Sequence, residues 1–512
     1  MKKFSHFFIA VFAAFFITAF IAGCSSSSTS TNESGQENAE GTETNGSDNA
    51  QQNNEDSEEG YEALQGKLEV DPVSGPVLTE VEIHATGLDP NEEAKIVWHT
   101  KEGKYELKNI YQFVRAAYED KLVELGTATA DENGELITKV TIPEGFGGDH
   151  DIGIYQNDKL MAKANFFVRT TFTIDSERGP VGSWITITGK GLGWKDYGSI
   201  WHVNYDNRYT GMITAISTNG TAVAKFRAAG PVGPHTITVE SGAHGMPYIN
   251  RQQSPHSYLE TQRFSYYVTD ENPGELTYVT DVPEQAANGG AELPEPQNAE
   301  GVTVEIDKEM GVVGEEVTIT ASGLPANSEA TFIWHTMVGN RVSGQGFSET
   351  TNELGKATTD ANGNLEFKFP APDDLGGPPH LIDIVINDKV MGQTYFKIIP
   401  SIVKIEPQSG PVGTEIEIEV KGVGWTEYDN IYNIVYDNAY IGYVCGFNSQ
   451  GTVNFKIEAS GTPGYHIIDL YPGIYKGENN FPEIFKRPQL TYEKDHPGSR
   501  IPSIHFGFKV TE

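Results

Sequence analysis

Apolar and polar residues alternate in short stretches along most of this chain. Between 415 and 420, Ile416, Ile418 and Val420 alternate with glutamates, and residues 316–321 repeat the pattern with threonine and glutamate as the polar partners. A period of two with one apolar face is typical of a half-buried β-strand. A glycine then ends each stretch. The chain is therefore expected to consist mainly of β-strands.

The alternating stretches belong to four segments that begin alike, with a short strand, a Gly-Pro or Gly-Val turn and then the alternating strand. These segments start at Glu69, Thr173, Glu305 and Lys404. A second shared strand carries a large aromatic residue on its inward phase. The aromatic residues are Trp98, Trp201, Trp334 and Tyr432. An inward aromatic on a central strand fills the core of an immunoglobulin-type sandwich, so we expect the same role here.

Two further elements recur in a fixed order. Asn-Gly turns at 131–134 and 360–363, with weaker forms at 218–220 and 449–451, predict hairpins. A strand led by glycine and histidine follows each turn. Its histidines are His150, His235, His380 and His466. Four elements repeated four times in one order indicate four related domains.

A longer repeat groups these four domains into two pairs. Trp98-His99-Thr100 returns as Trp334-His335-Thr336, an offset of 334 − 98 = 236. The string GLGW ending at Trp194 returns as GVGW ending at Trp425, an offset of 425 − 194 = 231. Such a long period indicates a duplicated two-domain unit.

The SGPVG turn, the following G-x-G, the TTDANG turn and the G-x-H-x-I strand resemble the IPT/TIG and related bacterial immunoglobulin-like surface repeats. The resemblance implies an all-β chain of four tandem immunoglobulin-like β-sandwich domains, with about 100 residues in each. It also implies work as spacers, adhesive modules or carbohydrate-associated domains. The family has no catalytic set to transfer.

The expected domains are 66–169, 170–270, 301–399 and 400–512, with a linker at 271–300 that is rich in Pro, Glu, Ala and Asn. Within each half the junction leaves no spare polar residues, which predicts two rigid rods joined by one flexible hinge. Residues 105–122 carry apolar side chains at helical spacing and predict a short helix over an edge or a junction.

The N-terminus resembles a bacterial lipoprotein signal. Lys2 and Lys3 precede an apolar run at 7–22, and small residues lead directly to Cys24. The resemblance implies removal of residues 1–23 and attachment of acyl chains, palmitate among them, to Cys24. The protein would then be exported and anchored by its lipid to the outer face of the cell membrane, or to the outer membrane.

Residues 24–65 are expected to form a disordered, self-repelling tether. Positions 25–60 hold nine acidic residues and no Lys or Arg, and they lack the apolar side chains that a core needs. The formal net charge of the whole chain is −35. Such a charge repels phosphates, so we expect no nucleic-acid partner, and contact with a membrane only through the lipid.

Cysteine and histidine are the residue types most able to carry chemistry. With Cys24 lipidated, Cys445 has no partner, and its place in an alternating strand predicts a buried, inert thiol. His99 and His335 lie on the outward phase, and the histidines of the later strand could join them in a metal site. No third ligand follows at a fixed spacing, so bonds from the later histidines to the backbone are the favoured interpretation. No nucleophile elbow, zinc-protease or phosphate-loop motif is present. We expect no enzyme, cofactor or metal.

Two long insertions are the best places for a ligand site, since long loops in compact domains are often functional. Both lie after the glycine-histidine strand, at 243–262 and 471–504. The candidate contact residues are Tyr248, His256, Tyr258, Tyr475, Phe481, Phe485 and Tyr492. These aromatics suit stacking on a glycan or contact with a protein, but they could equally pack each loop onto its own sandwich. The sequence favours a surface spacer or adhesion-type binding protein. A polysaccharide-binding accessory protein and a metal-binding surface module are the alternatives.

Overall fold

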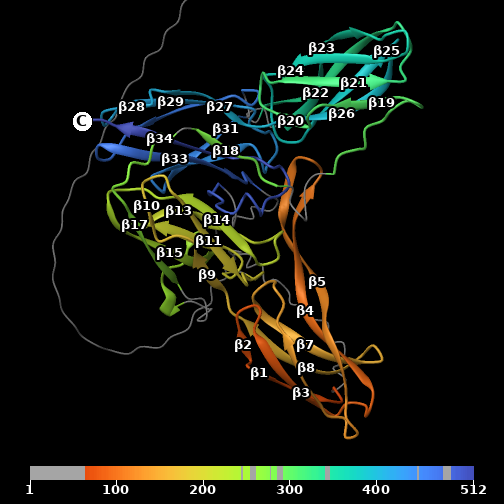
Figure 1. The fold of residues 1–512 in the computed structure, drawn as a ribbon, viewed down its shortest axis with the longest axis vertical. Helices are drawn as coiled ribbons and strands as arrows, with labels where there is room; N and C mark the ends of the chain where they lie inside the picture. Colours follow the sequence, from red (N-terminus) through yellow and green to blue (C-terminus); the bar gives the residue numbers. More distant parts are fainter. Residues whose placement is uncertain are drawn as a thin grey trace, which may run out of the picture. The chain divides into compact units, whose positions relative to one another are not determined.

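A computed structural model describes residues 64–195, 197–243, 246–253, 261–276, 278–284, 292–340, 346–446, 449–476 and 486–512. Strands dominate this part of the chain, and its helical content is the single 3-10 turn η1 (Arg251–Gln253) (Figure 1). The strands form sheets that face each other around apolar cores. The predicted all-β class, built from β-sandwich domains, is confirmed.

The first sandwich has a three-stranded and a five-stranded sheet. The smaller sheet has the order β1 (Lys67–Asp71), β3 (Glu80–Thr86), β6 (Leu136–Thr141). The larger has the order β2 (Ser74–Gly75), β8 (Lys159–Val168), β7 (Gly148–Gln156), β4 (Glu93–Lys108), β5 (Gln112–Thr129).

The third sandwich repeats this arrangement. Its smaller sheet has the order β19 (Thr303–Ile306), β21 (Glu316–Ser322), β24 (Leu365–Pro370). Its larger sheet has the order β20 (Met310–Gly311), β26 (Lys389–Ile398), β25 (His380–Ile386), β22 (Glu329–Asn340), β23 (Gly346–Thr358).

The second sandwich pairs β9 (Thr171–Ile174), β11 (Trp184–Lys190) and β14 (Ala222–Arg227) in its smaller sheet. Its larger sheet has the order β10 (Arg178–Gly179), β17 (Gln262–Val268), β15 (Gly233–Ala243), β12 (Trp201–Tyr205), β13 (Arg208–Ile213). A short strand, β16 (Met246–Pro247), pairs with β15.

The fourth sandwich has the same plan, with one strand supplied from outside its expected boundary. Its smaller sheet holds β27 (Ser401–Glu406), β29 (Glu415–Lys421) and β32 (Val453–Glu458). Its larger sheet has the order β18 (Val279–Asp281), β34 (Ser503–Val510), β33 (Gly464–Gly473), β30 (Ile431–Tyr436), β31 (Ala439–Cys445), and β28 (Ser409–Gly410) also pairs with β34.

The predicted inward aromatics occupy the cores. Trp98, Trp201, Trp334 and Tyr432 are all at most 2 % exposed. The apolar faces of the alternating strands lie opposite them, as Ile416 and Ile418 do in the fourth core. Period two therefore identified the strands and the side of each strand that becomes buried.

The Asn-Gly turns do not make hairpins, contrary to the prediction. The turn at 131–134 joins β5, which pairs with β4, to β6, which pairs with β3 in the opposite sheet. Its local shape is as expected: Asp131 Oδ1 accepts bonds from Asn133 N and Glu135 N, and Gly134 has φ +74°. Turn chemistry fixes the local geometry, but long-range pairing decides which strands the turn connects.

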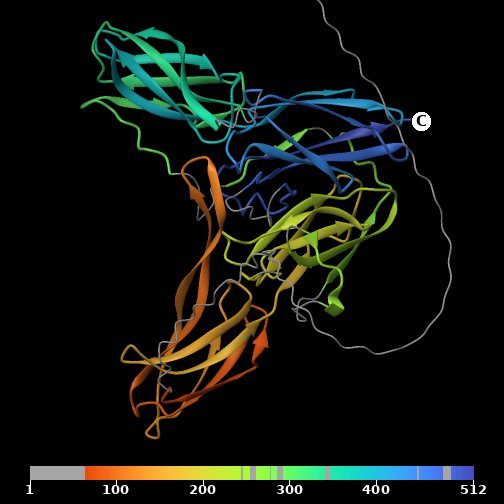
Figure 2. The ribbon, with the colours of Figure 1, turned by 180° about the vertical axis from the view of Figure 1, so that it is seen from behind.

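The predicted helix at 105–122 is also wrong. These residues form the outer parts of β4 and β5, which run on as a two-stranded ribbon beyond their sheet (Figure 2). Only Lys95–Trp98 of β4 pairs with β7. Tyr105 and Phe113 are buried on one side of this ribbon, so a period of two describes the segment better than the helical spacing does. We call residues 99–122 the first arm.

The described part of 271–300 does not form the predicted flexible hinge. β18 pairs with β34, and the hydroxyl of Tyr278 accepts a bond from Ile402 N. Further along, Gln297 N donates to Gln393 of the third sandwich. The Pro- and Glu-rich composition suggested a linker, but the segment also carries apolar residues that pair with a sheet edge.

Candidate functional site

The second and fourth sandwiches share a buried interface, although the third lies between them in the chain. Val435, Tyr471 and Leu490 of the fourth sandwich belong to the core cluster of the second. Residues of β13 lie close to residues of β31 at the same contact. The two non-consecutive sandwiches therefore form one packed body, and not the ends of two separate rods.

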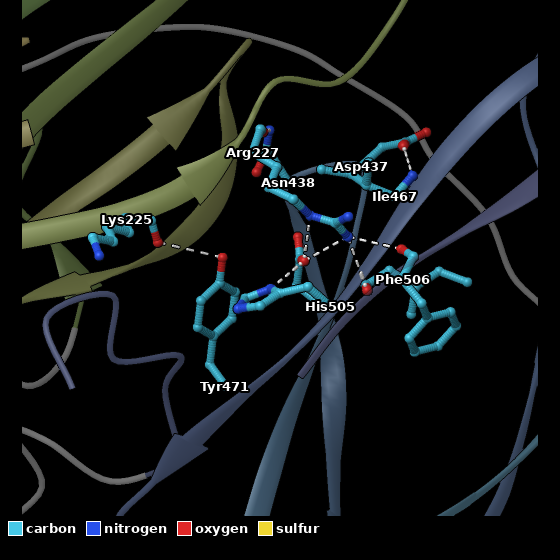
Figure 3. Close-up of polar contacts among 10 residues, drawn as sticks. Lys225, Arg227, Asp437, Asn438, Ile467, Tyr471, His505 and Phe506 are labelled. Carbon is cyan, nitrogen blue, oxygen red and sulfur yellow. Dashed lines mark hydrogen bonds and ion pairs between the residues drawn. The ribbon is translucent and has the colours of Figure 1, made fainter. Parts of the chain in front are cut away.

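A buried ionic cluster, made of Arg227, Asp469 and His505, lies in this interface (Figure 3). The Arg227 guanidinium donates to Asp469 Oδ1 at 2.8 Å from Nε, and to the carbonyl oxygens of Ile468 and Phe506. His505 Nδ1 lies 2.7 Å from the same carboxylate oxygen. We call these three residues the Arg227 cluster.

The Arg227 cluster is electrostatically matched. Burial alone would raise the pKa of Asp469, but Arg227 and His505 hold it below its usual value. The interface backbone is also paired, since Asn438 Nδ2 donates to the carbonyl oxygen of Arg227 and Thr210 Oγ1 donates to that of Asn438. Because the Arg227 guanidinium donates to three acceptors, the ion pair is held in one geometry. Removal of one partner should strongly lower the free energy of unfolding.

The first arm docks on this body. Phe113 N donates to Glu427 Oε2 at 3.1 Å, and the Tyr428 hydroxyl donates to the Ile110 carbonyl oxygen at 2.7 Å. On the other side, the Tyr105 hydroxyl donates to Asp495 Oδ2 at 3.1 Å. The apolar residues at this contact form a cluster of their own. They are Tyr105, Phe113, Ile200, Met212, Ile216, Tyr428 and Ile474.

Tyr475, one of the predicted contact residues, lies at the surface of the packed body in a cationic aromatic group. The Lys486 ammonium lies 4.5 Å from the centre of the Tyr475 ring and 5.2 Å from that of Tyr443. Tyr443 is 41 % exposed. We call Tyr443, Tyr475 and Lys486 the surface cluster. Two aromatic faces beside an ammonium suit stacking on a sugar ring or on a protein surface.

The backbone around the surface cluster is fixed from several sides. Tyr475 N donates to the Glu427 carbonyl oxygen, and Lys486 N donates to that of Ile474. The Tyr440 hydroxyl donates to the Lys486 carbonyl oxygen at 2.8 Å. Sequence reasoning missed Tyr443 and Lys486. The alternation along β31 is the signal that could have identified Tyr443. It places that ring on the exposed side of the strand, whereas we expected this side to be buried.

The other predicted contact residues differ in their burial and surroundings. Tyr492 is 1 % exposed and belongs to the fourth core, so its prediction as a ligand contact is wrong. Tyr248 is half-buried and its ring meets Tyr197 edge to face at 5.8 Å. His256, Tyr258, Phe481, Phe485 and Cys24 lie outside the described residues.

Each histidine of the later strand bonds to the backbone, as predicted, and His235 and His466 also contact the carboxylates of Asp206 and Asp437. The ring nitrogens of His150 lie 2.9 and 2.8 Å from the carbonyl oxygens of His99 and Phe146. His380 repeats this arrangement with His335 and Leu375. Both rings stack on the core tryptophan of their own sandwich. These side chains are therefore committed to the core.

His335 has carboxylate partners on both ring nitrogens. Glu349 lies 2.6 Å from Nδ1 and Asp383 lies 2.9 Å from Nε2. Burial lowers the pKa of His335, but the two carboxylates raise it further, so it ends above its usual value. A protonated ring between two carboxylates forms an ion-pair network, an arrangement that needs no metal.

Three further observations bear on chemistry. Cys445 is exposed, so the prediction of a buried thiol is wrong, because β31 turns that phase outward. The described residues hold no group of three or more His, Cys, Asp or Glu side chains placed to bind a metal ion. Over the same residues, no helix has the length and apolar character needed to cross a bilayer.

No protein-family model matches the sequence, and no curated protein is similar to it. Among solved structures, Salmonella alpha-2-macroglobulin reacted with methylamine aligns over 88 % of this chain and 31 % of its own, at 8 % identity and a TM-score of 0.18. Native E. coli alpha-2-macroglobulin aligns over 86 % and 30 %, at 7 % identity and a TM-score of 0.17. This chain thus spans about a third of the macroglobulins. A Corynebacterium diphtheriae protein described as membrane anchored aligns over 65 % of this chain and 89 % of its own, at 10 % identity and a TM-score of 0.17. Similarities this distant indicate no function.

Proposed function

We propose that this chain is a non-catalytic, lipid-anchored surface protein of a bacterial cell, which presents a ligand-binding face at the end of an acidic tether. The lipoprotein-like sequence that ends at Cys24 supports the anchor, and the IPT/TIG-like repeats support the spacer and adhesion class. That class implies no catalytic step. A polysaccharide-binding accessory role is the alternative within the same proposal.

The observation that carries the proposal is the surface cluster and its mounting. Tyr443 and Tyr475 present aromatic rings on a body that the Arg227 cluster joins from two sandwiches. Rigid aromatic anchors bind with little loss of side-chain freedom, which favours their use as contact residues. An extended polymer or a surface protein would fit such an open face better than a small molecule would.

The test is retention of the full chain on insoluble glycans and cell-wall preparations. Tyr475→Ala should reduce retention at least about tenfold, since one anchor residue can carry more than 1.4 kcal/mol of binding. Tyr465→Ala is the matched control, because Tyr465 also lies beside a lysine, Lys509, at 5.6 Å, and belongs to another part of the sheet. Unchanged retention of the Tyr475 variant would remove the surface cluster as the binding face.

A further inference from the structure

The two sandwich pairs share one junction geometry but fill it differently. At the first junction, Gly147 bridges to Gly193, and at the second, Gly376 bridges to Gly424. A Cβ on Gly147 or Gly376 would lie 2.0 Å or less from the carbonyl oxygen of Gly191 or Gly422, so both bridges need glycine. Each bridge leads directly into a tryptophan of the repeated GLGW or GVGW string. The two junctions can therefore be compared position by position.

At the second junction, two buried side chains of the protein occupy the space beside the bridge. Asp429 is fully buried, and its Oδ1 accepts a bond from Thr426 N at 2.7 Å. A Cβ on Gly377 would lie 2.6 Å from Asp429 Oδ2, which shows how closely this carboxylate fills the space. Lys397 is also buried and donates to the Ser499 carbonyl oxygen.

At the first junction, both filling side chains are replaced. Gly198 follows Trp194 by the same four positions as Asp429 follows Trp425. Phe167 pairs with the short strand β2 as Lys397 pairs with β20, so it takes the place of the lysine. A Cβ on Gly148, the counterpart of Gly377, would meet nothing within 4 Å. The result is a cavity of about 150 Å³ between the first and second sandwiches.

The chemistry of this cavity is mixed. Trp194, Trp201 and Phe167 supply aromatic surface, and Gln262 also lines the cavity. Charged side chains of both signs, those of Asp149, Arg169 and Lys195, also border it and are themselves exposed. The charged groups therefore lie at the mouth, where the Lys195 ammonium is 5.8 Å from the centre of the Trp194 ring, while the buried Trp201 and glycine backbone lie deeper.

The second junction shows how burial at this position changes the pKa of a charged side chain. Burial lowers the pKa of Lys397 to about 8 and raises that of Asp429 to about 6, even though each group favours the charged form of the other. A charged ligand deep in the cavity at the first junction would likewise lose part of its hydration. A neutral ring with one apolar face and polar edges fits the mixed lining better. A cavity of this size holds about one six-membered ring.

We propose that the cavity beside Trp194 and Gly198 binds a single neutral saccharide unit, which stacks on the aromatic lining and bonds to Gln262 and the backbone at its edges. The site shares no residue with the surface cluster. It rests on the proposed function only in that a surface-binding protein needs such subsites. A ligand with so few atoms should have a dissociation constant on the order of 1 mM.

The test is saturation-transfer NMR and titration of the full chain with the methyl glycosides of glucose, galactose, mannose and N-acetylglucosamine. Gly198→Asp transfers the residue of the second junction into the first. A Cβ there meets no atom closer than 3.6 Å, so the fold should accept it. At least one glycoside should bind the native chain, and Gly198→Asp should weaken that binding at least about tenfold by filling the cavity. The matched control is Gly145→Asp, which adds the same charge at a glycine outside the lining, where a Cβ meets only Thr100 Oγ1 at 3.9 Å.

Gln262→Ala is a second variant that does not depend on filling the cavity, and it should weaken binding at least about fivefold. Equal affinity in the native chain and both variants would overturn the site. Binding of N-acetyl-tryptophanamide or glucuronate in place of every neutral glycoside would overturn the ligand class. Tyr475→Ala should leave glycoside binding unchanged, so failure at this cavity and failure at the surface cluster give different results.

Discussion

At the scale of single residues, two buried pairs of oppositely charged residues differ in their surroundings. Arg227 has carboxylate and carbonyl acceptors within reach, and its partner Asp469 keeps a lowered pKa. Lys397 and Asp429 are as deeply buried, but their mutual attraction does not offset the loss of water. Burial therefore lowers the pKa of Lys397 and raises that of Asp429, which favours the neutral form of each. Both pairs make stability depend on pH: the lowered pKa of Asp469 contributes stability that is lost in acid, whereas the lowered pKa of Lys397 acts at alkaline pH.

The lowered pKa of Lys397 determines the direction in which this residue makes stability depend on pH. The folded chain releases the Lys397 proton at a pKa of about 8, whereas the unfolded chain keeps it to 10.5. Between these values the unfolded state binds more protons at Lys397, so the contribution of Lys397 to the free energy of unfolding should rise with pH, by about 1–2 kcal/mol from pH 8 to 9.5. Buried tyrosines with raised pKa values, such as Tyr105 and Tyr432, act in the opposite direction in the native chain and in a Lys397→Met variant alike. Urea denaturation of both proteins across this range should therefore give a more positive slope for the native chain, and equal slopes would exclude the Lys397 contribution.

At the scale of elements, the first arm adds a second contact between the first sandwich and the rest of the fold, beyond the bridge from Gly147 to Gly193. Its contact depends on one close approach: Gly103 N donates to Asn219 Oδ1, and a Cβ on Gly103 would lie 2.2 Å from the Ile216 carbonyl oxygen. Because the obstacle is backbone, a side chain there cannot be accommodated by a rotamer change. Glycine is needed at this position for packing, not for its backbone conformation.

Gly103→Ala should therefore lift the arm from the second sandwich. We expect a loss of about 1–3 kcal/mol in stability, as for overpacking in a core, and faster hydrogen exchange of the amides from Tyr105 to Phe113. Strands β3 and β6 should keep their protection. Gly145→Ala is the control, since a Cβ there would make only an ordinary contact with Thr100 Oγ1 at 3.9 Å. Unchanged exchange at Phe113 in the Gly103 variant would show that the arm contact does not depend on this approach.

The sequence predicted elements better than it predicted their connections. Alternation located strands such as β21 and β29 and the core tryptophans, because period two and burial are local properties. The helix predicted at 105–122 failed because a short apolar run fits both periods, and only the docking surface selects one. The hairpins predicted at the Asn-Gly turns failed for a related reason: a turn defines its own dihedral angles but not its strand partners.

The candidate site shows the same limit. The sequence predicts Tyr475 and Tyr492 alike as contact residues of one long loop, but Tyr492 enters the fourth core. Tyr443 was overlooked because exposure of one phase of β31 depends on what covers that sheet edge. The cavity beside Gly198 likewise depends on the folded structure. The sequence aligns Gly198 with Asp429 but cannot show that the Asp429 side chain fills a space which Gly198 leaves open.

At the scale of the whole molecule, the decisive contact joins parts of the chain that the repeat pattern assigns to different halves. Arg227 and Asp469 are 242 residues apart. In sequence, Arg227 is simply the last residue of an alternating strand, and nothing local marks it as an interface residue. The duplicated unit has therefore not stayed a pair of independent rods, because its second and fourth sandwiches have become each other's neighbours.

Arg227→Met should break this body. The variant leaves the Asp469 carboxylate buried with only His505 as a charged partner, and loss of one partner of a buried pair costs about 3–5 kcal/mol. Calorimetry of the native chain should show the second and fourth sandwiches melting in one transition. In the variant that transition should move to lower temperature and split, and protease sites in 271–300 should be cut faster. Lys225→Met is the matched control, because Lys225 pairs with Glu493 at a partly exposed position and its loss should cost less than about 1 kcal/mol. If both variants melt alike, the Arg227 cluster does not hold the two sandwiches together, and their apolar contact alone must do so.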